Sequence, residues 1–275
     1  MTAPGFLRLP RDVVSVAGPQ AGEYLQGQLS QDLDGLEVGH AVFSFVLQPQ
    51  GKVDAFVRVT HFGDQTFVLD VDTGWGEALL ARLRRFLMRT KAEVAAVDWA
   101  VVAVRDAVVE PPPGAVAVSP ETPGVVGVDL IGPLVPDPEG MAPLDPAAYE
   151  MMRIRAGVPR MGTELDERTI PGASGVVDRA VSFTKGCYTG QELVARIDAR
   201  GDRLPTRLRG IVAGDGTALA VGDPIDVGGR EVGRISSAAG DVGLGYVRRE
   251  VDVPAEATVS GRPVRVEALP LTAVG

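Results

Sequence analysis

The residue best placed for chemistry is Cys187, the only cysteine among 275 residues. It lies in the segment Thr184–Glu192 (TKGCYTGQE), with Gly186 and Gly190 on either side. Glycines let the backbone turn tightly and approach another group closely. A helix is expected to begin at about Gly190, so the thiol would lie just before a helix N-terminus, where unpaired N–H groups favour a thiolate. Lys185 adds a positive charge two residues away, and the pattern therefore indicates a reactive thiol.

A lone cysteine can also simply fill space in a core, and that alternative stays open. The polar, glycine-rich neighbours of Cys187 argue against deep burial. No general base is evident, because His40 and His61 both flank strand segments and are interpreted as strand-end residues. Gln191 and Glu192 fall in the first turn of the following helix, where an acidic side chain is favoured with or without a function.

Alternating apolar residues predict strands in the first hundred residues. The candidates are residues 13–16, 41–47, 53–59, 66–71, 94–97 and 101–104. Residues 41–47 and 53–59 alternate on the two sides of a turn at 48–51, as the strands of an antiparallel hairpin do. Pro19 is expected in the first turn of a helix that contains Tyr24 and Leu25.

A helix is predicted from Trp75 to Met88, with Thr73 as its N-cap. Four arginines lie near its end, at positions 82, 84, 85 and 89. They are interpreted as a solvated face at a helix C-terminus, where the helix dipole favours cations. A face that binds an anionic ligand is the alternative.

The middle of the chain is expected to contain few regular elements. Residues 110–143 are rich in Pro, Gly and Val and predict one or two connecting strands within loops. Asp145-Pro146 predicts the start of a helix that Gly157 ends. Residues 158–185 are expected to be mostly irregular, and a second helix is predicted over 190–199.

After Arg203, short strands alternate with glycine turns. The candidates are residues 208–212, 225–227, 231–236, 242–247 and 264–266. This spacing is typical of a small β-barrel. The sequence therefore predicts an α+β fold with two domains. Residues 1–203 form an α+β body, as one unit or two subdomains, and residues 204–275 form the barrel.

The composition excludes several classes of protein. Lys and Arg total 27 against 36 Asp and Glu, so the net charge is −9, and no nucleic-acid partner is expected. No apolar run approaches the roughly 20 residues that are needed to span a bilayer, so no membrane partner is expected. A single cysteine rules out an intrachain disulfide and a four-cysteine metal site, so no metal held by this chain alone is expected. The N-terminus lacks the pattern of a signal peptide, and a cytoplasmic protein is expected.

The cysteine segment resembles the signature of the YgfZ-type folate-binding proteins, which are related to the glycine-cleavage T-protein, an aminomethyltransferase. The resemblance continues into the flanking residues 177–183 (VDRAVSF) and 193–196 (LVAR). Residues 24–32 (YLQGQLSQD), 161–166 (MGTELD) and 170–171 (IP) are also similar to the family pattern. The match extends from about Val13 into the predicted barrel.

The resemblance implies a T-protein-like, three-part cloverleaf around a central channel that binds tetrahydrofolate. It implies an accessory role in the assembly or repair of iron–sulfur proteins, with iron–sulfur client or assembly proteins as transient partners. Cys187 would then be the functional thiol and Lys185 its partner in the site. The candidate folate-binding residues are Tyr188, Gln191, Glu192, Arg196, Gln28 and Asp32.

Two departures from the transferase pattern make aminomethyl transfer doubtful. The transferases carry an acidic pair in the strand after a glycine turn, whereas Gly51 is followed here by a strand with Asp54 alone. They also grip the pterin ring with a Glu at the position of Arg155. A guanidinium only donates hydrogen bonds and cannot accept those of a pterin.

The sequence therefore leaves three functions open. The first is a folate-binding accessory factor in which Cys187 contacts a cluster transiently or takes part in redox chemistry. The second is a folate scaffold or sensor with a buried, structural thiol. The third, which the departures disfavour, is a tetrahydrofolate-dependent aminomethyltransferase. Whether the protein is an enzyme is left open.

Overall fold

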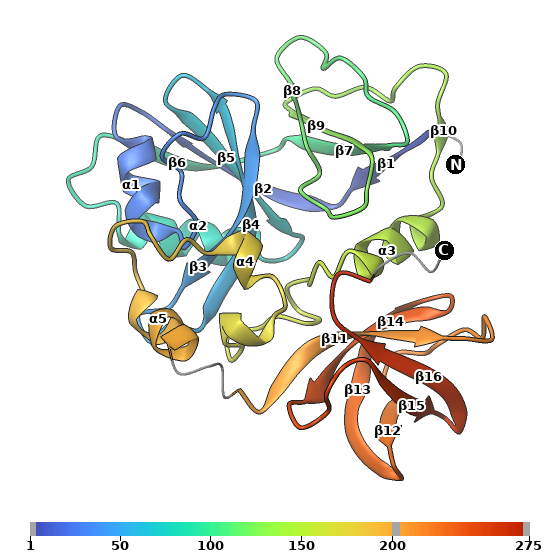
Figure 1. Ribbon diagram of the computed structural model, residues 1–275. Coiled ribbons are helices and arrows are strands. Elements are labelled where there is room, and N and C mark those ends of the chain that lie inside the picture. The colour runs from blue at the N-terminus through green and yellow to red at the C-terminus, as the bar shows by residue number, and fades with distance from the viewer. Residues whose placement is uncertain (1–3, 200–203, 272–275) are drawn as a thin grey trace. The chain divides into compact units, whose positions relative to one another are not determined.

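A computed structural model describes residues 4–199 and 204–271, which fold into two compact units (Figure 1). The first unit comprises the residues up to Glu121 together with 125–144 and 178–193. The second comprises 122–124, 145–177 and the residues from Val194 onwards. Helices and strands are mixed along the chain, so the predicted α+β class is confirmed.

Five antiparallel strands form the first sheet of the first unit, in the order β3–β4–β5–β2–β6. They are β2 (Arg11–Ala17), β3 (Ala41–Leu47), β4 (Val53–Gly63), β5 (Thr66–Asp72) and β6 (Glu93–Val97). The predicted hairpin is confirmed, since β3 pairs with β4 and places Phe45 opposite Phe56. The five strands that period-two alternation predicted here are all present.

A second five-stranded sheet completes this unit, in the order β10–β1–β7–β9–β8. Its strands are β1 (Gly5–Leu9), β7 (Ala100–Arg105), β8 (Val116–Val118), β9 (Gly127–Gly132) and β10 (Ala142–Pro143). One buried cluster contains residues of both sheets, including Val13 and Val68 of the first and Val101 and Ile131 of the second. The region 110–143 contributes three strands where one or two were expected.

Six buried or half-buried charges connect the two sheets in one chain of ion pairs. Their order is Asp72–Arg11–Asp70–Arg58–Asp129–Arg105. Arg58, with 4% of its side chain exposed, donates to Asp70 at 2.9 Å and to Asp129. A lone buried ion is expensive to desolvate, and three arginines matched by three aspartates offset that cost.

Two helices accompany the first sheet: α1 (Ala21–Gln28) contacts β5, and α2 (Gly76–Arg85) contacts β2 and β6. The expected place of Pro19 in the first turn of α1 is wrong. Gly18, at φ 131°, turns against the backbone of Lys91, and Pro19 belongs to that turn. The helix begins only after it.

The expected N-cap of α2, Thr73, is also wrong. The helix begins at Gly76, and Trp75 at the N-cap makes no side-chain hydrogen bond. Asp12 of β2 supplies the acceptor instead, since its Oδ2 receives the N–H groups of Gly74 and Gly76 at 2.8 Å each. The helix ends at Arg85, three residues earlier than its apolar spacing predicts.

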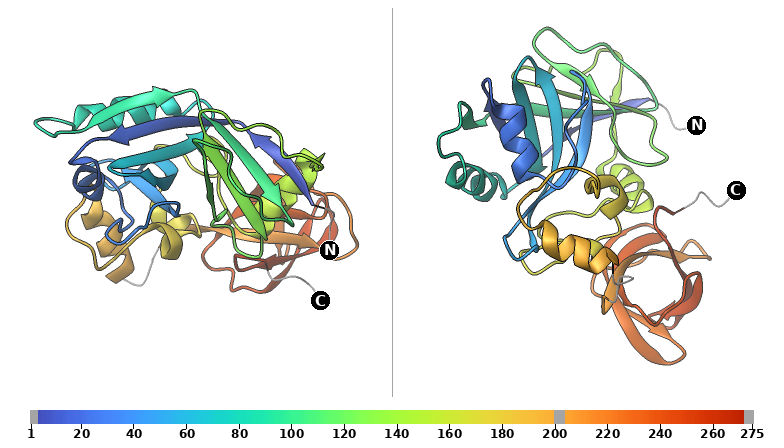
Figure 2. Two further views of the ribbon diagram at one scale, coloured as in Figure 1. Left: turned by 90° about the horizontal axis from the view of Figure 1, so that it is seen from above. Right: turned by 60° about the vertical axis from the view of Figure 1, so that its left-hand side comes forward.

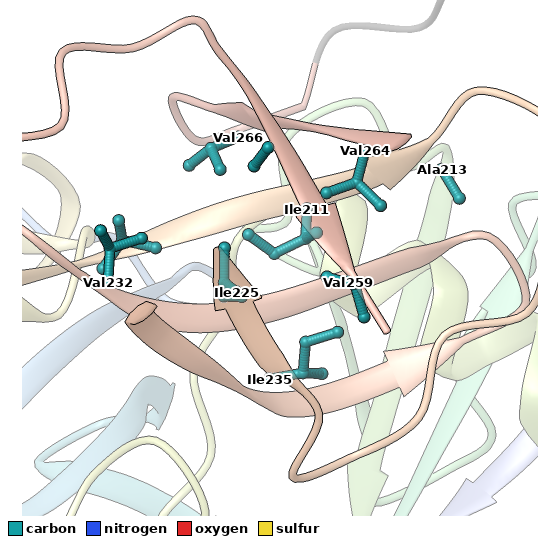
Figure 3. Close-up of a cluster of buried hydrophobic side chains, with 10 residues drawn as sticks. Ile211, Ala213, Ile225, Val232, Ile235, Val259, Val264 and Val266 are labelled. Carbon is teal, nitrogen blue, oxygen red and sulfur yellow. The ribbon is translucent and has the colours of Figure 1, made fainter. Parts of the chain in front are cut away.

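The second unit contains a closed barrel in the order β11–β14–β13–β12–β15–β16, seen end-on in the right view of Figure 2. The strands are β11 (Thr206–Ala213), β12 (Pro224–Val227), β13 (Arg230–Ala239), β14 (Val242–Arg248), β15 (Ala255–Val259) and β16 (Arg262–Glu267). Branched side chains such as Ile211, Ile225, Ile235 and Val266 fill its interior (Figure 3). The predicted C-terminal barrel is confirmed, with β15 as an additional strand.

The helix α3 (Pro146–Arg155) of the second unit begins and ends as predicted. Asp145 accepts the N–H of Ala147 at 2.9 Å, and Gly157 follows the helix at φ 65°. The remaining short elements are η1 (Pro171–Ala173), α4 (Val177–Ala180) and α5 (Gln191–Ala199). In the part of the chain that the structure describes, no helix is long and apolar enough to cross a membrane.

Candidate functional site

Cys187 lies on an exposed loop between α4 and α5, and its thiol forms no disulfide. The helix α5 begins at Gln191, one residue later than expected, so Cys187 precedes the helix by four residues. The prediction that polar and glycine neighbours would keep the thiol near solvent is confirmed. The alternative of a buried, space-filling cysteine does not fit this loop.

The loop between α4 and α5, residues 181–190, is called the cysteine loop. Lys185 binds this loop to the C-terminal end of α1. Its ammonium group donates to the carbonyl oxygens of Leu29 at 2.9 Å and Gln31 at 2.7 Å, and to Gln26 Oε1 at 3.1 Å. An ammonium has three donors, and all three are therefore used. The carbonyls at a helix C-terminus carry partial negative charge and favour a cation there.

The surroundings of Lys185 are only partly open to solvent. Burial lowers the pKa of Lys185 to about 8, against the opposing effect of the Asp32 and Asp34 carboxylates. The Tyr188 ring lies below the ammonium, with its centroid 5.4 Å from Nζ. Lys185 is thus a cation held between one aromatic ring, two carboxylates and the end of a helix.

Further hydrogen bonds join the same two stretches of chain. Ser30 Oγ donates to the carbonyl oxygen of Ala180 at 2.6 Å, and Ser182 N–H donates to the carbonyl oxygen of Ser30 at 2.9 Å. Gln31 Nε2 donates to the carbonyl oxygen of Arg179 at 2.8 Å. The segments 24–32 and 177–192, which carry most of the family resemblance, are therefore bound to each other.

Gln26 is the centre of this contact, although the sequence did not single it out. Its Oε1 accepts from Lys185 Nζ and from the N–H of Leu33 at 2.9 Å. Its Nε2 donates to Asp32 Oδ1 at 2.7 Å. This hydrogen bond, the N–H of Asp34 and the charge of Lys185 hold the pKa of Asp32 below its ordinary value.

Gly190 lies directly against the β3–β4 turn. At φ 83°, a Cβ on this residue would come within 2.5 Å of the carbonyl oxygen of Gln48 and 3.2 Å of Gly51 Cα. Gly186 differs, because a Cβ there would meet nothing within 4 Å. Packing within the chain thus requires a glycine at position 190, whereas a side chain at position 186 would find open space beside Cys187.

The candidate ligand residues after Cys187 differ in how far they are already used within the chain and in how exposed they are. Gln191 accepts the N–H of Tyr188 through Oε1 at 3.0 Å, which closes the loop before α5. Tyr188 is half-buried, and this burial raises its pKa to about 12. Glu192 is exposed. Arg196 belongs to α5, but its side chain lies outside the described part of the structure.

Gln28 belongs to a neighbouring polar cluster around Arg82. The Arg82 guanidinium donates to Gln28 Oε1 at 3.0 Å, to Asp54 Oδ2 at 3.1 Å and to the carbonyl oxygen of Leu47 at 3.0 Å. Leu47 is also the residue whose Cβ a side chain at position 190 would meet at 2.8 Å. This cluster therefore supports the hairpin against which the cysteine loop packs.

The segment 161–166 has a structural role within the second unit. Arg153 of α3, with 6% of its side chain exposed, donates to both carboxylate oxygens of Glu150, at 3.0 and 2.7 Å. It also reaches Glu164 at 3.3 Å and Ser237 Oγ at 2.7 Å. Ser237 in turn donates to Glu164 Oε1 at 2.6 Å. Glu164 thereby fastens this segment to both α3 and the barrel strand β13.

Comparisons with known proteins support one family. Residues 206–271 match the family model for the CAF17 C-terminal beta-barrel domain. The structure of aminomethyltransferase T from Bartonella henselae aligns with 98% of this chain and 86% of its own, at a TM-score of 0.82 and 18% identity. At that identity the likeness establishes the fold alone, and the predicted T-protein-like fold is confirmed.

Related sequences carry two further names. The IBA57 homologue of Pyricularia oryzae, named a mitochondrial iron–sulfur cluster assembly factor, is 28% identical over 94% of this chain and 75% of its own length. The tRNA-modifying protein YgfZ of Pectobacterium carotovorum is 27% identical over 69% of this chain. Together these matches support a YgfZ-type protein.

These relatives extend beyond the regions that match this chain. An uncharacterized protein of Haemophilus influenzae is 29% identical over 69% of this chain. The matched regions cover 66% of that protein and 64% of the Pectobacterium YgfZ. This chain thus spans slightly less than two thirds of the length of these two bacterial relatives.

Arg155 is the residue that the sequence resemblance places where the transferases have a pterin-binding Glu. Its Nη2 lies 3.7 Å from Asp241 Oδ1, and about a third of each side chain is exposed. The guanidinium offers only donors at this position. Asp54, the single acid of its strand, is already bound by Arg82.

The candidate site therefore has one chemically distinctive group. It is an exposed thiol on a loop that Lys185 and Gly190 hold in place. Within residues 4–199 and 204–271, no three side chains of the metal-binding types come together as a metal site requires. A thiol in this setting can act as a nucleophile or as one ligand of a shared metal centre.

Proposed function

We propose that this chain is a folate-binding accessory protein that supports the assembly or repair of iron–sulfur clusters, with Cys187 as its functional thiol. The observation that carries the proposal is the exposed position of the only thiol on an internally braced loop. The names of the IBA57 and YgfZ relatives and the T-protein fold point the same way.

One thiol sets a limit on how the protein acts. Iron–sulfur clusters are held by about four protein ligands, so Cys187 cannot hold a cluster alone. It would supply one ligand during a transient contact, and an iron–sulfur client or assembly protein would supply the others. The cytoplasm is the proposed location.

Tetrahydrofolate is the proposed cofactor. The candidate contact residues remain Tyr188, Gln191, Glu192, Arg196, Gln28 and Asp32. Gln28 and Gln191 already serve as acceptors within the chain. Tyr188 and Glu192 have no side-chain hydrogen bonds among the described residues, so they are the members of this set that are best able to meet a ligand. Both lie within five residues of Cys187, so a folate bound there would lie near the thiol.

The two alternative functions fit less well. A scaffold with a structural thiol requires burial, and Cys187 is exposed. An aminomethyltransferase requires a catalytic carboxylate near the folate, and Asp54 is held by Arg82.

The test is the activity of iron–sulfur enzymes in cells whose only copy of the protein carries Cys187→Ala. We expect those activities to fall to the level of cells that lack the protein. The purified variant should keep the wild-type melting temperature, because the side chain is exposed. Normal enzyme activities in the variant cells would refute the proposed function.

A further inference from the structure

The end of α2 and the turn after it form a basic surface that the site described above does not use. Residues 82–91 contain five basic residues and no acidic residue, in a chain whose net charge is −9. Arg82 is turned inward toward Asp54 and Gln28, whereas the others are exposed. The exposed residues define the α2 surface: Arg84, Arg85, Phe86, Met88, Arg89 and Lys91.

No carboxylate within residues 4–199 and 204–271 pairs with the charges of the α2 surface. Among the described residues, Arg85, Arg89 and Lys91 form no ion pair, and Arg84 makes only a hydrogen bond from Nε to the carbonyl oxygen of Val94. Several exposed arginines elsewhere are instead paired with carboxylates, namely Arg8 with Asp137, Arg234 with Glu231 and Arg265 with Glu267. A cluster of cations without counter-charges favours an anionic partner. The net negative charge of the rest of the chain does not prevent this, because physiological salt screens charges that lie more than about 8 Å away.

Two apolar side chains lie among these charges. Met88 is 80% exposed and Phe86 is 38% exposed, and the Arg82 guanidinium lies 4.1 Å from the Phe86 ring centroid. Arginine, methionine and aromatic residues are the types enriched at protein interfaces. A surface that bound only phosphates would gain little from an exposed methionine. The composition therefore favours a protein partner over a nucleic acid.

We infer that the α2 surface docks an acidic iron–sulfur protein, with Arg85 and Arg89 facing carboxylates and Met88 at the apolar centre of the contact. The inference rests on the proposed function for the kind of partner and on the unpaired charges for its acidity. It assigns a role to the arginines that the sequence indicated only as a solvated face or an anion-binding face.

The experiment measures the binding of the labelled full chain to an acidic plant-type [2Fe–2S] ferredoxin at 20, 50 and 150 mM salt. We expect saturable binding that weakens as the salt concentration rises. Arg85→Glu/Arg89→Glu should weaken it at least tenfold at 50 mM salt. Met88→Ser should weaken it several-fold with an unchanged salt dependence, because that change removes no charge.

The matched control is Arg230→Glu/Arg262→Glu, which makes the same change of charge on exposed barrel residues and should bind like the wild type. Total tRNA and phosphatidylglycerol vesicles are titrated in parallel. The inference is overturned if ferredoxin does not bind, if both double variants bind equally, or if only tRNA or vesicles depend on Arg85 and Arg89. Binding is measured without Cys187 chemistry, so its failure is separate from failure of the Cys187→Ala test in cells.

Discussion

Lys185 Nζ donates a hydrogen bond of 2.9 Å to the carbonyl oxygen of Leu29, and so joins two segments that lie 156 residues apart in the chain. The same ammonium binds Gln31 and Gln26, so its position is determined by the end of α1. Cys187 follows two residues later and is therefore held at a defined place although it is exposed. These hydrogen bonds of Lys185 therefore set the position of the site.

Replacing Lys185 with Met should loosen the loop and change stability in a pH-dependent way. The pKa of Lys185 is about 8 in the folded chain, below the ordinary value of 10.5. Between pH 8 and pH 10.5 this lysine carries a proton more often in the unfolded chain than in the folded chain. The contribution of Lys185 to stability therefore rises with pH through this window and is lost as pH falls through 8. The unfolding free energy of the wild type minus that of Lys185→Met should therefore increase from pH 8 to pH 10.5. Urea titrations that show a constant or falling difference would contradict this.

The two glycines beside Cys187 should respond differently to alanine. Gly190→Ala places a Cβ against the Gln48 carbonyl at positive φ, and a loss of about 1–3 kcal/mol is expected. Gly186→Ala meets open space and should leave the free energy of unfolding almost unchanged. Chemical denaturation of both variants checks the pair. Equal losses would show that the loop does not pack against the hairpin turn in this way.

The buried ion pairs of the first unit should make Asp129 a sensitive position. Asp129→Asn leaves Arg58 and Arg105 buried without their shared carboxylate, at an expected cost of about 3–5 kcal/mol. Asp137→Asn, which removes an exposed pair with Arg8, should cost less than about 1 kcal/mol. Urea unfolding at pH 7 compares them. Similar values for the two variants would be inconsistent with a continuous buried network.

Acid should weaken the same network. Burial opposes ionisation of Asp129, but Arg58 and Arg105 hold its pKa below the ordinary value. Its contribution to stability is therefore present above the unfolded pKa of about 3.9 and lost as pH falls through the lower, folded value. The wild type should lose its stability advantage over Asp129→Asn under strongly acidic conditions. An advantage that stayed constant down to pH 2 would argue against a paired carboxylate.

Asp54→Asn separates the proposed function from aminomethyl transfer. Because Asp54 is bound to Arg82 and serves the hairpin, we expect Asp54→Asn cells to keep most of the iron–sulfur enzyme activity that Cys187→Ala cells lose. The measurement is the same enzyme panel in both strains. A loss in Asp54→Asn cells as large as that of Cys187→Ala, with folding intact, would restore the transferase hypothesis.

Local patterns predicted the fold well where each element has its own signal. The β3–β4 hairpin alternates regularly, and Asp145-Pro146 marks the start of α3 directly. The strand β15 was missed because Ala255–Val259 contains only one large apolar residue. The start of α2 was misplaced because its acceptor, Asp12, comes from a distant strand and leaves no local trace.

The sequence predicted the cysteine segment of the site but not the residues from other parts of the chain that contact it. The exposed position of Cys187 follows from its neighbours, and the need for Gly190 follows from a close approach. Gln26 could not be found, because its hydrogen bond from Lys185 depends on the fold bringing α1 to the cysteine loop. Its other two hydrogen bonds, with Asp32 and Leu33, depend on how the chain turns after α1. The contact between residues 24–32 and 177–192 is likewise a tertiary property, since neither segment predicts the other.

The most direct measurement is the alkylation rate of Cys187 at fixed pH, with and without tetrahydrofolate. As the only cysteine, it gives an unambiguous signal. A variant with Cys187→Ser and Val221→Cys, which places a thiol at an exposed barrel position, is the control. We predict that folate slows alkylation of Cys187 several-fold and leaves the control unchanged. Equal rates with and without saturating folate, or no folate binding at all, would contradict a functional thiol at a folate site.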